Sequence, residues 1–413
     1  MKRHRFIPAL ALVAVLPMTA VAASAHFPPE SVGTVEQRAY QDVRIGDPRL
    51  GAQSVDLDFH RGTGNFFAAV SWADGWSLNI STDGGATWQE TYFYPSASEI
   101  SMKVGGDFAW VSYASSTTPT QLRMRRFSAE TGASDSIYHY QLVGNIHPAT
   151  IIDVAMTSSA DDNDSAVYVA CIGSDNAAYF FWDDLVGTSF DSVHPPITNA
   201  EACLDITYNP DSSSGFFLFM SFEGMGWLQV WRLHFFVGWD HPLTSVVNGN
   251  NNYTAISAYQ DTIVTMIEMD NTYGNGILQF VNTNSGQGGE WSAEIVYYPY
   301  SSSTPEAAGP DVSLRSPFGS MLTYQLEEGA FDGVYYRQRQ GHGLGSLSNA
   351  VSINDVDSAA QEQTTVEWLG AGCGGTYGVV YLSGGDFVPY FDLVTPWAIF
   401  CDGFESGNTS AWN

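Results

Sequence analysis

Carboxylates stand beside aromatic side chains in several short polar segments of this chain. Asp74 lies between Trp72 and Trp76, and Glu223 precedes Trp227 by four positions. Two carboxyl groups can divide the acid and base roles of glycosidic bond cleavage, and aromatic rings can stack on sugar faces. The candidate ligand contacts are Trp72, Trp76, Glu223, Trp227, Tyr273 and Asp332, and the candidate catalytic residues are Arg44, Asp74 and Glu327. The alternative is that each carboxylate is a solvated turn residue, because acidic residues and glycine are common in turns.

Repeats explain why these segments recur. A strand-like alternation of apolar residues begins near residues 54, 99, 150, 203, 253, 311 and 365, at intervals of about 45 to 58 residues. Each is followed by a denser apolar strand and, after a polar turn, by a third strand, and no helix-length run has a 3.6-residue period. The pattern predicts an all-β protein, a seven-bladed β-propeller over residues 26–400 with four-stranded antiparallel blades. Six blades, with one repeat misread, is the alternative.

The strand order also predicts how the ring closes and which residues share a mouth of its channel. The seventh repeat lacks a clear fourth strand, and the segment from Thr34 to Ile45 reads as a strand without a neighbour. We therefore expect this segment to supply the outer strand of the last blade. First strands start, and second strands end, at one rim. That rim should carry all the candidate ligand contacts, together with Asp175, Asp270, Glu328, Asp386, His147, His194 and Glu201.

The stretch STDGGATW lies between the third and fourth strands of the first repeat and matches the pattern S-x-D-x-G-x-T-W. An Asp side chain can accept hydrogen bonds from backbone N–H groups further along a turn, glycine permits positive φ, and a Trp ring can cover a hairpin. These residue types build a turn without needing a substrate. The five specified positions are Ser81, Asp83, Gly85, Thr87 and Trp88, and NTNSGQGGEW from Asn282 is a degenerate copy.

This motif resembles the Asp box of BNR-repeat propellers, a group that includes sialidases. The resemblance implies a propeller fold, export and often a glycan ligand. It does not imply hydrolysis, because Asp boxes also occur in propellers that only bind. The sequence VRIGDP resembles the Arg-Ile-Pro motif of sialidases at Arg44 and Ile45, with Gly46 where proline is expected. Sialidases also need two further arginines to hold the substrate carboxylate, and arginine is scarce in this chain.

Glycan binding is therefore the favoured function. An exo-sialidase or another glycoside hydrolase is the enzyme alternative, and a protein-binding scaffold is the third possibility. The expected partner is an extracellular glycan or glycoprotein, contacted by a monomer.

Four cysteines in an exported chain most simply form two disulfides. Cys171 ends the second strand of the third repeat and Cys203 begins the first strand of the fourth, so both fall at the same rim. Cys373 and Cys401 both fall at the opposite rim. The sequence therefore predicts the bonds Cys171–Cys203 and Cys373–Cys401.

The two ends of the chain point to export. Residues 1–25 combine a basic start, an apolar run and the small residues Ala-Ser-Ala, which is the pattern of a signal peptide cleaved before His26. We expect a secreted, periplasmic or cell-surface protein, with residues 401–413 as a short tail that could be a sorting signal. The net charge of −29 argues against nucleic acid, and no later apolar run is long enough to span a membrane.

No cofactor is expected. The acidic run DDNDS at residues 161–165 could bind calcium, but the glycine and the distal glutamate of an EF-hand loop are missing. The chain has no CxxC or HxxxH pair that would indicate zinc.

Overall fold

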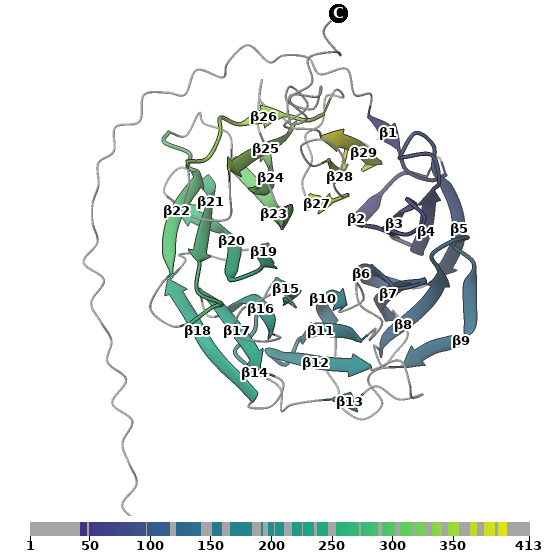
Figure 1. Ribbon diagram of the computed structural model, residues 1–413, viewed down its shortest axis with the longest axis horizontal. Helices are drawn as coiled ribbons and strands as arrows, with labels where there is room; N and C mark the ends of the chain where they lie inside the picture. Colours follow the sequence, from purple (N-terminus) through teal and green to yellow (C-terminus); the bar gives the residue numbers. More distant parts are fainter. Residues whose placement is uncertain are drawn as a thin grey trace, which may run out of the picture. The chain divides into compact units, whose positions relative to one another are not determined.

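Seven β-sheets surround a central channel in the computed structural model, as the blades of a propeller (Figure 1). This arrangement confirms the predicted all-β fold and the seven blades, and it rules out the alternative of six. The propeller belongs to one compact unit, Gln37–Asn413. The structure describes residues 42–394 apart from positions 48, 96, 116–120, 142–150, 159–165, 184–190, 193–196, 202, 210–216, 225, 235–237, 247–252, 272–273, 288–290, 302–305, 317–318, 328–332, 341–345, 355–363, 370–375 and 385–386.

The first strand of each sequence repeat is the innermost strand of its blade. Blade 1 contains β2 (Ala52–Phe59), β3 (Phe66–Trp72), β4 (Gly75–Ser81) and β5 (Gln89–Pro95). Blade 2 contains β6 (Ala97–Gly105), β7 (Phe108–Ser115), β8 (Gln121–Ser128) and β9 (Ser134–Gln141). Blade 3 contains β10 (Ile151–Ser158), β11 (Val167–Gly173), β12 (Ala177–Asp183), β13 (Asp191–Ser192) and β14 (Ile197–Thr198). Its last two strands pair with opposite ends of β12, so they form the fourth strand of this blade in two short pieces.

The remaining blades follow the same order. Blade 4 contains β15 (Leu204–Asn209), β16 (Phe217–Gly224), β17 (Trp227–His234) and β18 (Gly238–Val246). Blade 5 contains β19 (Thr254–Tyr259), β20 (Thr262–Asn271), β21 (Gly274–Asn282) and β22 (Ser292–Tyr297). Blade 6 contains β23 (Glu306–Ser316), β24 (Gly319–Glu327), β25 (Gly333–Gln340) and β26 (Val351–Ser352). Blade 7 contains β27 (Thr365–Trp368), β28 (Tyr377–Leu382), β29 (Pro389–Val394) and β1 (Val43–Arg44). The described residues contain no helix long and apolar enough to cross a membrane.

The N-terminal strand closes the ring. β1 pairs antiparallel with β29, with Val43 opposite Phe391 and Arg44 opposite Tyr390. Ile45 follows β1 and is fully buried in the hydrophobic cluster between blades 7 and 1. The predicted closure of the last blade by the N-terminal segment is thus confirmed for its final residues, which are the part that the structure describes.

Each blade buries both faces against its neighbours. Every residue of β3, β11 and β28 is buried. Side chains alternate between the two faces: Val169 and Cys171 pack in the cluster shared with blade 2, whereas Ala170 and Ile172 pack in the cluster shared with blade 4. This double burial explains why the second strands read as continuous apolar runs.

The antiparallel order gives the propeller two different rims. The blade-to-blade connections and the turns between second and third strands lie at one rim, which we call the linker rim. The turns between first and second strands, and between third and fourth strands, lie at the other, which we call the turn rim. The STDGGATW stretch belongs to the turn rim, because it joins β4 to β5.

Candidate functional site

Large apolar side chains are exposed mainly at the linker rim. Trp227 starts β17 just after a second-to-third turn and is 41% exposed, and Tyr298 and Tyr300, in the link from blade 5 to blade 6, are 43% and 65% exposed. Leu50 and Ile152, at two other blade starts, are exposed at the same rim. Soluble proteins bury most such side chains, so their collection at one rim marks a candidate binding face.

Two glutamates lie near the turn that precedes Trp227. Glu223 is the penultimate residue of β16, on the other side of the turn from Trp227. Its Oε1 atom accepts a hydrogen bond of 2.7 Å from the backbone N–H of Gly226. Glu201 is exposed, and its backbone N–H donates to the carbonyl of Glu223 at 3.0 Å. The second-to-third turn of blade 4 and the link from blade 3 thus bring Glu201 and Glu223 together. The pairing of Glu223 with Leu228 and of Gly224 with Trp227 directs the Trp227 side chain to the other face of the blade at the same rim.

The two carboxyl groups have different environments. Glu223 is buried, and this desolvation raises the pKa of its carboxyl above the usual value, with the negative charge of Glu201 acting in the same direction and the Gly226 N–H opposing both. A carboxyl that retains its proton can act as a general acid. We call Glu201, Glu223 and Trp227 the Trp227 group.

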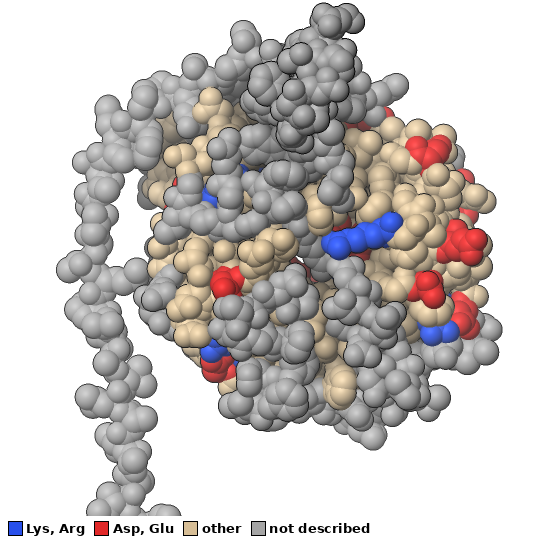
Figure 2. Space-filling model, in the orientation of Figure 1, with Lys and Arg blue, Asp and Glu red and all other residues tan. Residues whose placement is uncertain are grey.

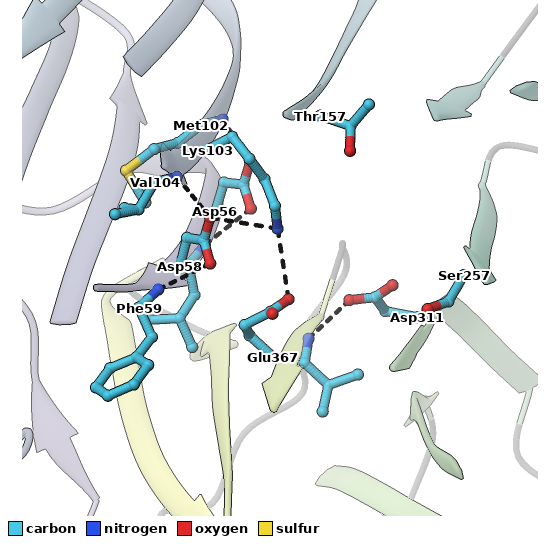
Figure 3. Close-up of polar contacts among 12 residues, drawn as sticks. Asp56, Asp58, Phe59, Met102, Lys103, Val104, Thr157, Ser257, Asp311 and Glu367 are labelled. Carbon is cyan, nitrogen blue, oxygen red and sulfur yellow. Dashed lines mark hydrogen bonds and ion pairs between the residues drawn. The ribbon is translucent and has the colours of Figure 1, made fainter. Parts of the chain in front are cut away.

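The central channel contains a second set of carboxylates (Figure 3). Four aspartates on inner strands each accept two backbone hydrogen bonds, one from the following residue and one from the inner strand of the next blade. The donors on the next blade are Met102 to Asp56 at 2.6 Å, Leu204 to Asp153 at 2.7 Å, Ile256 to Asp205 at 2.7 Å and Val366 to Asp311 at 2.7 Å. These aspartates therefore join neighbouring blades at the channel.

Burial raises the pKa of all four aspartates. The pKa is raised to about 6 for Asp56, about 7 for Asp205 and about 8 for Asp153, and it lies well above the usual range for Asp311. Desolvation is the largest cause in each case, and the negative charges of neighbouring carboxylates add to it. The channel encloses a cavity of about 130 Å³ between these strands.

Lys103 is the basic residue among the described residues that line this cavity. Its Nζ atom lies 3.3 Å from Oδ2 of Asp58 and 3.5 Å from Oε2 of Glu367, so it links blades 1, 2 and 7 (Figure 3). Asp58 is held in turn by the backbone N–H of Val104 at 2.6 Å. The ammonium group of Lys103 thus forms ion pairs with carboxylates of the ring.

The structure corrects the assignment of two tryptophans as ligand contacts. Trp72 is 2% exposed and its indole N–H donates to Ser77 at 2.9 Å. Trp76 is 0% exposed and packs against the rings of Tyr92 and Tyr113, 5.4 and 5.3 Å away between centroids. Both rings fill the spaces between blades, so neither offers a face on which a sugar could stack.

The three candidate catalytic residues lie on three different blades. Arg44 is on the outermost strand of blade 7, where its Nη2 donates to the carbonyl of Arg49 at 2.7 Å. Asp74 is an exposed residue in the β3–β4 turn of blade 1. Glu327 ends β24 in blade 6, and its side chain lies outside the described part. The described contacts bring none of these residues together.

The resemblance to an Arg-Ile-Pro motif fails at its third position for a structural reason. Gly46 has a φ of 73°, which proline cannot adopt because its ring fixes φ near about −65°. A Cβ atom on Gly46 would also come within 2.5 Å of Oδ1 of Asn79. The substitution of glycine for proline is therefore required by this backbone path.

Arginines on other blades have separate structural partners. Arg123 on β8 donates to the hydroxyl of Tyr94 at 2.7 Å, and Arg232 on β17 donates through Nε to Asp240 at 3.0 Å. Arg337 on β25 donates to the carbonyl of Val296 at 2.5 Å. The side chain of Arg315 lies outside the described part. The described arginines thus do not form a triad at one mouth of the channel.

The STDGGATW stretch forms a closed network of hydrogen bonds at the turn rim. Asp83 accepts from the backbone N–H of Thr87 at 2.9 Å and from its hydroxyl at 2.6 Å, and the Ser81 hydroxyl donates to Asp83 at 2.8 Å. Ser81 also accepts from Gly85 N–H at 2.9 Å. Trp88 packs edge-on against Phe391 of blade 7 with centroids 5.3 Å apart. The motif thus anchors a turn to the preceding blade.

The turn from Asn282 repeats part of this network. Oδ1 of Asn282 accepts from the N–H of Gly286 at 2.8 Å, just as Ser81 accepts from the glycine four positions later. Trp291 is partly buried against the clusters between blades 4 and 5.

The Cys171–Cys203 disulfide is not formed, because Cys171 is a free, buried thiol. The strand order correctly predicted that both cysteines lie at the same rim. It did not show that the two side chains lie on different faces of blade 3. Cys171 points into the cluster with blade 2, whereas Cys203 starts blade 4, on the far side of blade 3. Burial raises the pKa of the Cys171 thiol well above its usual value, which keeps it protonated.

Several other candidates lie outside the described residues. They are Tyr273, Asp332, Glu328, Asp386, His147, His194, the 161–165 acidic run, Cys373 and Cys401. Among the residues that are described, no group of three or more His, Cys, Asp or Glu side chains is placed to hold a metal ion.

Two features escaped the sequence analysis. The channel aspartates had a signal, because Asp recurs within the inner-strand pattern in SVDLDF, IIDVAM and CLDITY. Tyr298 and Tyr300 had no such signal in the sequence, because the run YYPY in a polar link does not show which rings will be exposed.

Comparisons with known proteins identify the fold. The propeller of the Penicillium chrysogenum α-L-arabinanase complexed with arabinobiose matches with a TM-score of 0.52 at 10% identity, covering 87% of this chain and 99% of that one. YCF48 from Cyanidioschyzon merolae matches with a TM-score of 0.52 at 13% identity, covering 86% and 98%. An α-L-arabinofuranosidase from Fusarium graminearum, in complex with an iminosugar inhibitor, matches with a TM-score of 0.50 at 10% identity, covering 86% and 97%. No protein-family model and no curated protein matches the chain.

Proposed function

We propose that this protein is an exported, glycan-binding propeller of the Asp-box type that holds its ligand at the linker rim beside Trp227. The observation that carries the proposal is the exposed indole of Trp227, 41% accessible, at the same rim as Glu201 and Glu223. An aromatic face stacks on a pyranose ring while neighbouring carboxylates accept hydrogen bonds from its hydroxyls. Tyr298 and Tyr300 extend the exposed aromatic surface along the same rim.

Two further considerations support glycan contact. The arabinanase and the arabinofuranosidase named above are propellers that were captured with a sugar and an iminosugar, so the fold is compatible with a sugar site. The N-terminal 25 residues have the pattern of a signal peptide, which would place the mature chain among extracellular glycans.

A glycan array probed with the mature chain from His26 tests the proposal. We expect signal on a subset of glycans, and we expect Trp227→Ala to lower it by about tenfold or more, the effect of losing one stacking contact of about 1.4 kcal/mol. Ile295→Ala is the matched control, because Ile295 is an exposed apolar residue on β22. A blank array across neutral, cationic and acidic glycans would contradict glycan binding and favour a protein-binding scaffold.

A glycoside hydrolase is the second candidate, and the raised pKa of the Glu223 carboxyl beside Glu201 favours it. Glu223 would donate its proton to the leaving oxygen, and Glu201 would act as the base or nucleophile. Turnover of chromogenic glycosides should then vanish in Glu223→Gln while binding persists. Release of fluorophore from a synthetic sialoside, lost in Arg44→Ala, would instead identify a sialidase.

A further inference from the structure

One face of blade 4 carries a row of aromatic and polar side chains that starts at Trp227. Side chains alternate along β17, so Trp227, Gln229 and Trp231 share the face that turns toward blade 3. Of the Trp227 group only Trp227 belongs to this row, because Glu223 lies opposite Leu228, which is buried on the side of blade 5. β17 and β18 are the two outer strands of the blade, so the row lies away from the channel (Figure 1).

The far end of the row is a flat stack of two rings. His241 on β18 lies parallel to Trp231, with centroids 4.5 Å apart and an interplanar angle of 7°. His241 is exposed, and the indole of Trp231 packs against the cluster between blades 3 and 4. Desolvation lowers the pKa of His241 despite the opposing negative charge of Asp240, so the imidazole is neutral near neutral pH. Trp227 and His241 thus offer two exposed ring surfaces on one face of the blade.

Polar groups occupy the interval between the two ring surfaces. Gln229 lies opposite Thr244 in the β17–β18 ladder, and Thr244 is exposed. Oε1 of Gln229 accepts the indole N–H of Trp231 at 3.2 Å, which leaves the amide Nε2 as a donor. A Cβ atom on Gly224 would lie 3.3 Å from this Nε2 and 1.6 Å from the carbonyl oxygen of Asn199. The amide and the link from blade 3 therefore both lie over Gly224, at the linker-rim end of the row.

We call this set the blade 4 row: Trp227, Gln229, Trp231, His241 and Thr244. No member of the row carries a charge. The ion pair of the same two strands, Arg232 with Asp240, lies on the other face, where Arg232 also donates to the carbonyl of Ser285 in blade 5 at 2.8 Å. The chain has a net charge of −29, and red acidic side chains outnumber blue basic ones on the face shown in Figure 2. The row therefore suits a neutral ligand, because the protein repels an anion and the row has no cation to hold one.

The spacing of the two ring surfaces sets the length of the ligand. Trp227 and Trp231 are four positions apart on one strand, and a strand rises about 3.3 Å per residue, so the rings lie about 13 Å apart. A single sugar ring is shorter than this interval, whereas several linked rings can span it. We infer that the ligand is a linear, neutral oligosaccharide that lies along β17 and β18, with one sugar on Trp227 and another on His241. Gln229 and Thr244 form hydrogen bonds with hydroxyls of the sugars between them. This inference rests on the proposed function and names the class of its ligand.

Calorimetric titration with oligosaccharides of two lengths tests this arrangement. The probes are cello-, xylo-, manno-, arabino- and chito-oligosaccharides, each as a dimer and as a hexamer, titrated into the mature chain from His26. In a series that binds, the hexamer should bind at least about tenfold more tightly than the dimer, because only the hexamer reaches both rings. A uronic acid hexamer should not bind. Equal affinity of dimer and hexamer in every series that binds would overturn the inference and leave glycan binding at Trp227 standing.

Variants of the blade 4 row locate the bound chain. His241→Ala should lower the affinity for the hexamer by about tenfold and leave that for the dimer nearly unchanged, since the dimer is held at Trp227. His241→Phe keeps a flat ring and should retain the affinity for the hexamer, which separates stacking from a loss of fold. Gln229→Ala should also weaken the hexamer, whereas Gln89→Ala, the same change at an exposed position on β5, should not.

Two outcomes would overturn the inference in different ways. Loss of hexamer affinity in Tyr300→Ala but not in His241→Ala would mean that the chain runs along the linker rim rather than down blade 4. Absence of binding in all five series would exclude linear neutral oligosaccharides as the ligand. In that case an array signal that is lost in Trp227→Ala would still support the proposed function.

Discussion

At the scale of single residues, side chains of the same type do different work according to where the backbone places them. Trp72, Trp76 and Trp227 all flank second-to-third turns, yet two are buried between blades and one is exposed. The sequence could place these rings at the linker rim, because strand order follows from the repeats. It could not tell which of them lie between blades, because that depends on how closely adjacent sheets pack.

The residues of the STDGGATW turn allow a prediction at this scale. Ser81→Ala should lower the free energy of unfolding by about 1 to 2 kcal/mol, because it removes the acceptor for the buried N–H of Gly85. Asp83→Ala should act in the same direction through the loss of both contacts with Thr87. Chemical denaturation measures the effect. Ligand affinity should be unchanged, since this turn lies at the rim opposite to Trp227. A stable variant that no longer binds the ligand would place the ligand site at the turn rim instead.

At the scale of elements, the alternation of apolar residues predicted the strands and the ring closure by the N-terminal segment. It did not predict that the fourth strand of blade 3 is divided into two pieces, because β13 and β14 are two residues long and have no apolar pattern of their own. The wrong disulfide has a related cause. Strand direction indicates the rim at which a cysteine lies, whereas the face toward which it points depends on the exact register, and Cys171 faces blade 2.

The turn between β4 and β5 gives a prediction with an internal control. Gly84 and Gly85 both have positive φ, of 76° and 90°. A Cβ atom would meet nothing within 4 Å at Gly84, but would lie 2.0 Å from the Phe391 ring at Gly85. Gly84→Ala should cost about 1 kcal/mol from backbone strain alone, and Gly85→Ala should cost at least about 1 kcal/mol more from overpacking.

Thermal unfolding of the two variants measures this difference. Adding Phe391→Leu should recover part of the loss in Gly85→Ala and none in Gly84→Ala. Equal losses in the two single variants would mean that the turn does not pack against blade 7 in solution.

At the scale of the whole molecule, the channel aspartates make the stability of the ring depend on pH. Their unfolded pKa is near about 3.8, and the folded values are raised to about 6 for Asp56, 7 for Asp205 and 8 for Asp153. The folded state therefore binds more protons than the unfolded chain between about pH 4 and pH 8. The stabilisation from this difference is complete below about pH 4 and is lost as the pH rises through the folded values.

The free energy of unfolding should consequently fall as the pH rises from about 4 to 8, by up to about 1.4 kcal/mol per pH unit for each aspartate within its window. Urea denaturation at a series of pH values measures the slope. Asp205→Asn replaces one titrating carboxyl by a neutral amide that can still accept the N–H of Ile256, so it should flatten the slope between about pH 4 and 7 and leave the propeller folded. An unchanged slope in this variant, or stability that rises with pH across the window in the wild type, would show that the carboxylates are ionised in the folded ring and that their two backbone N–H donors outweigh burial.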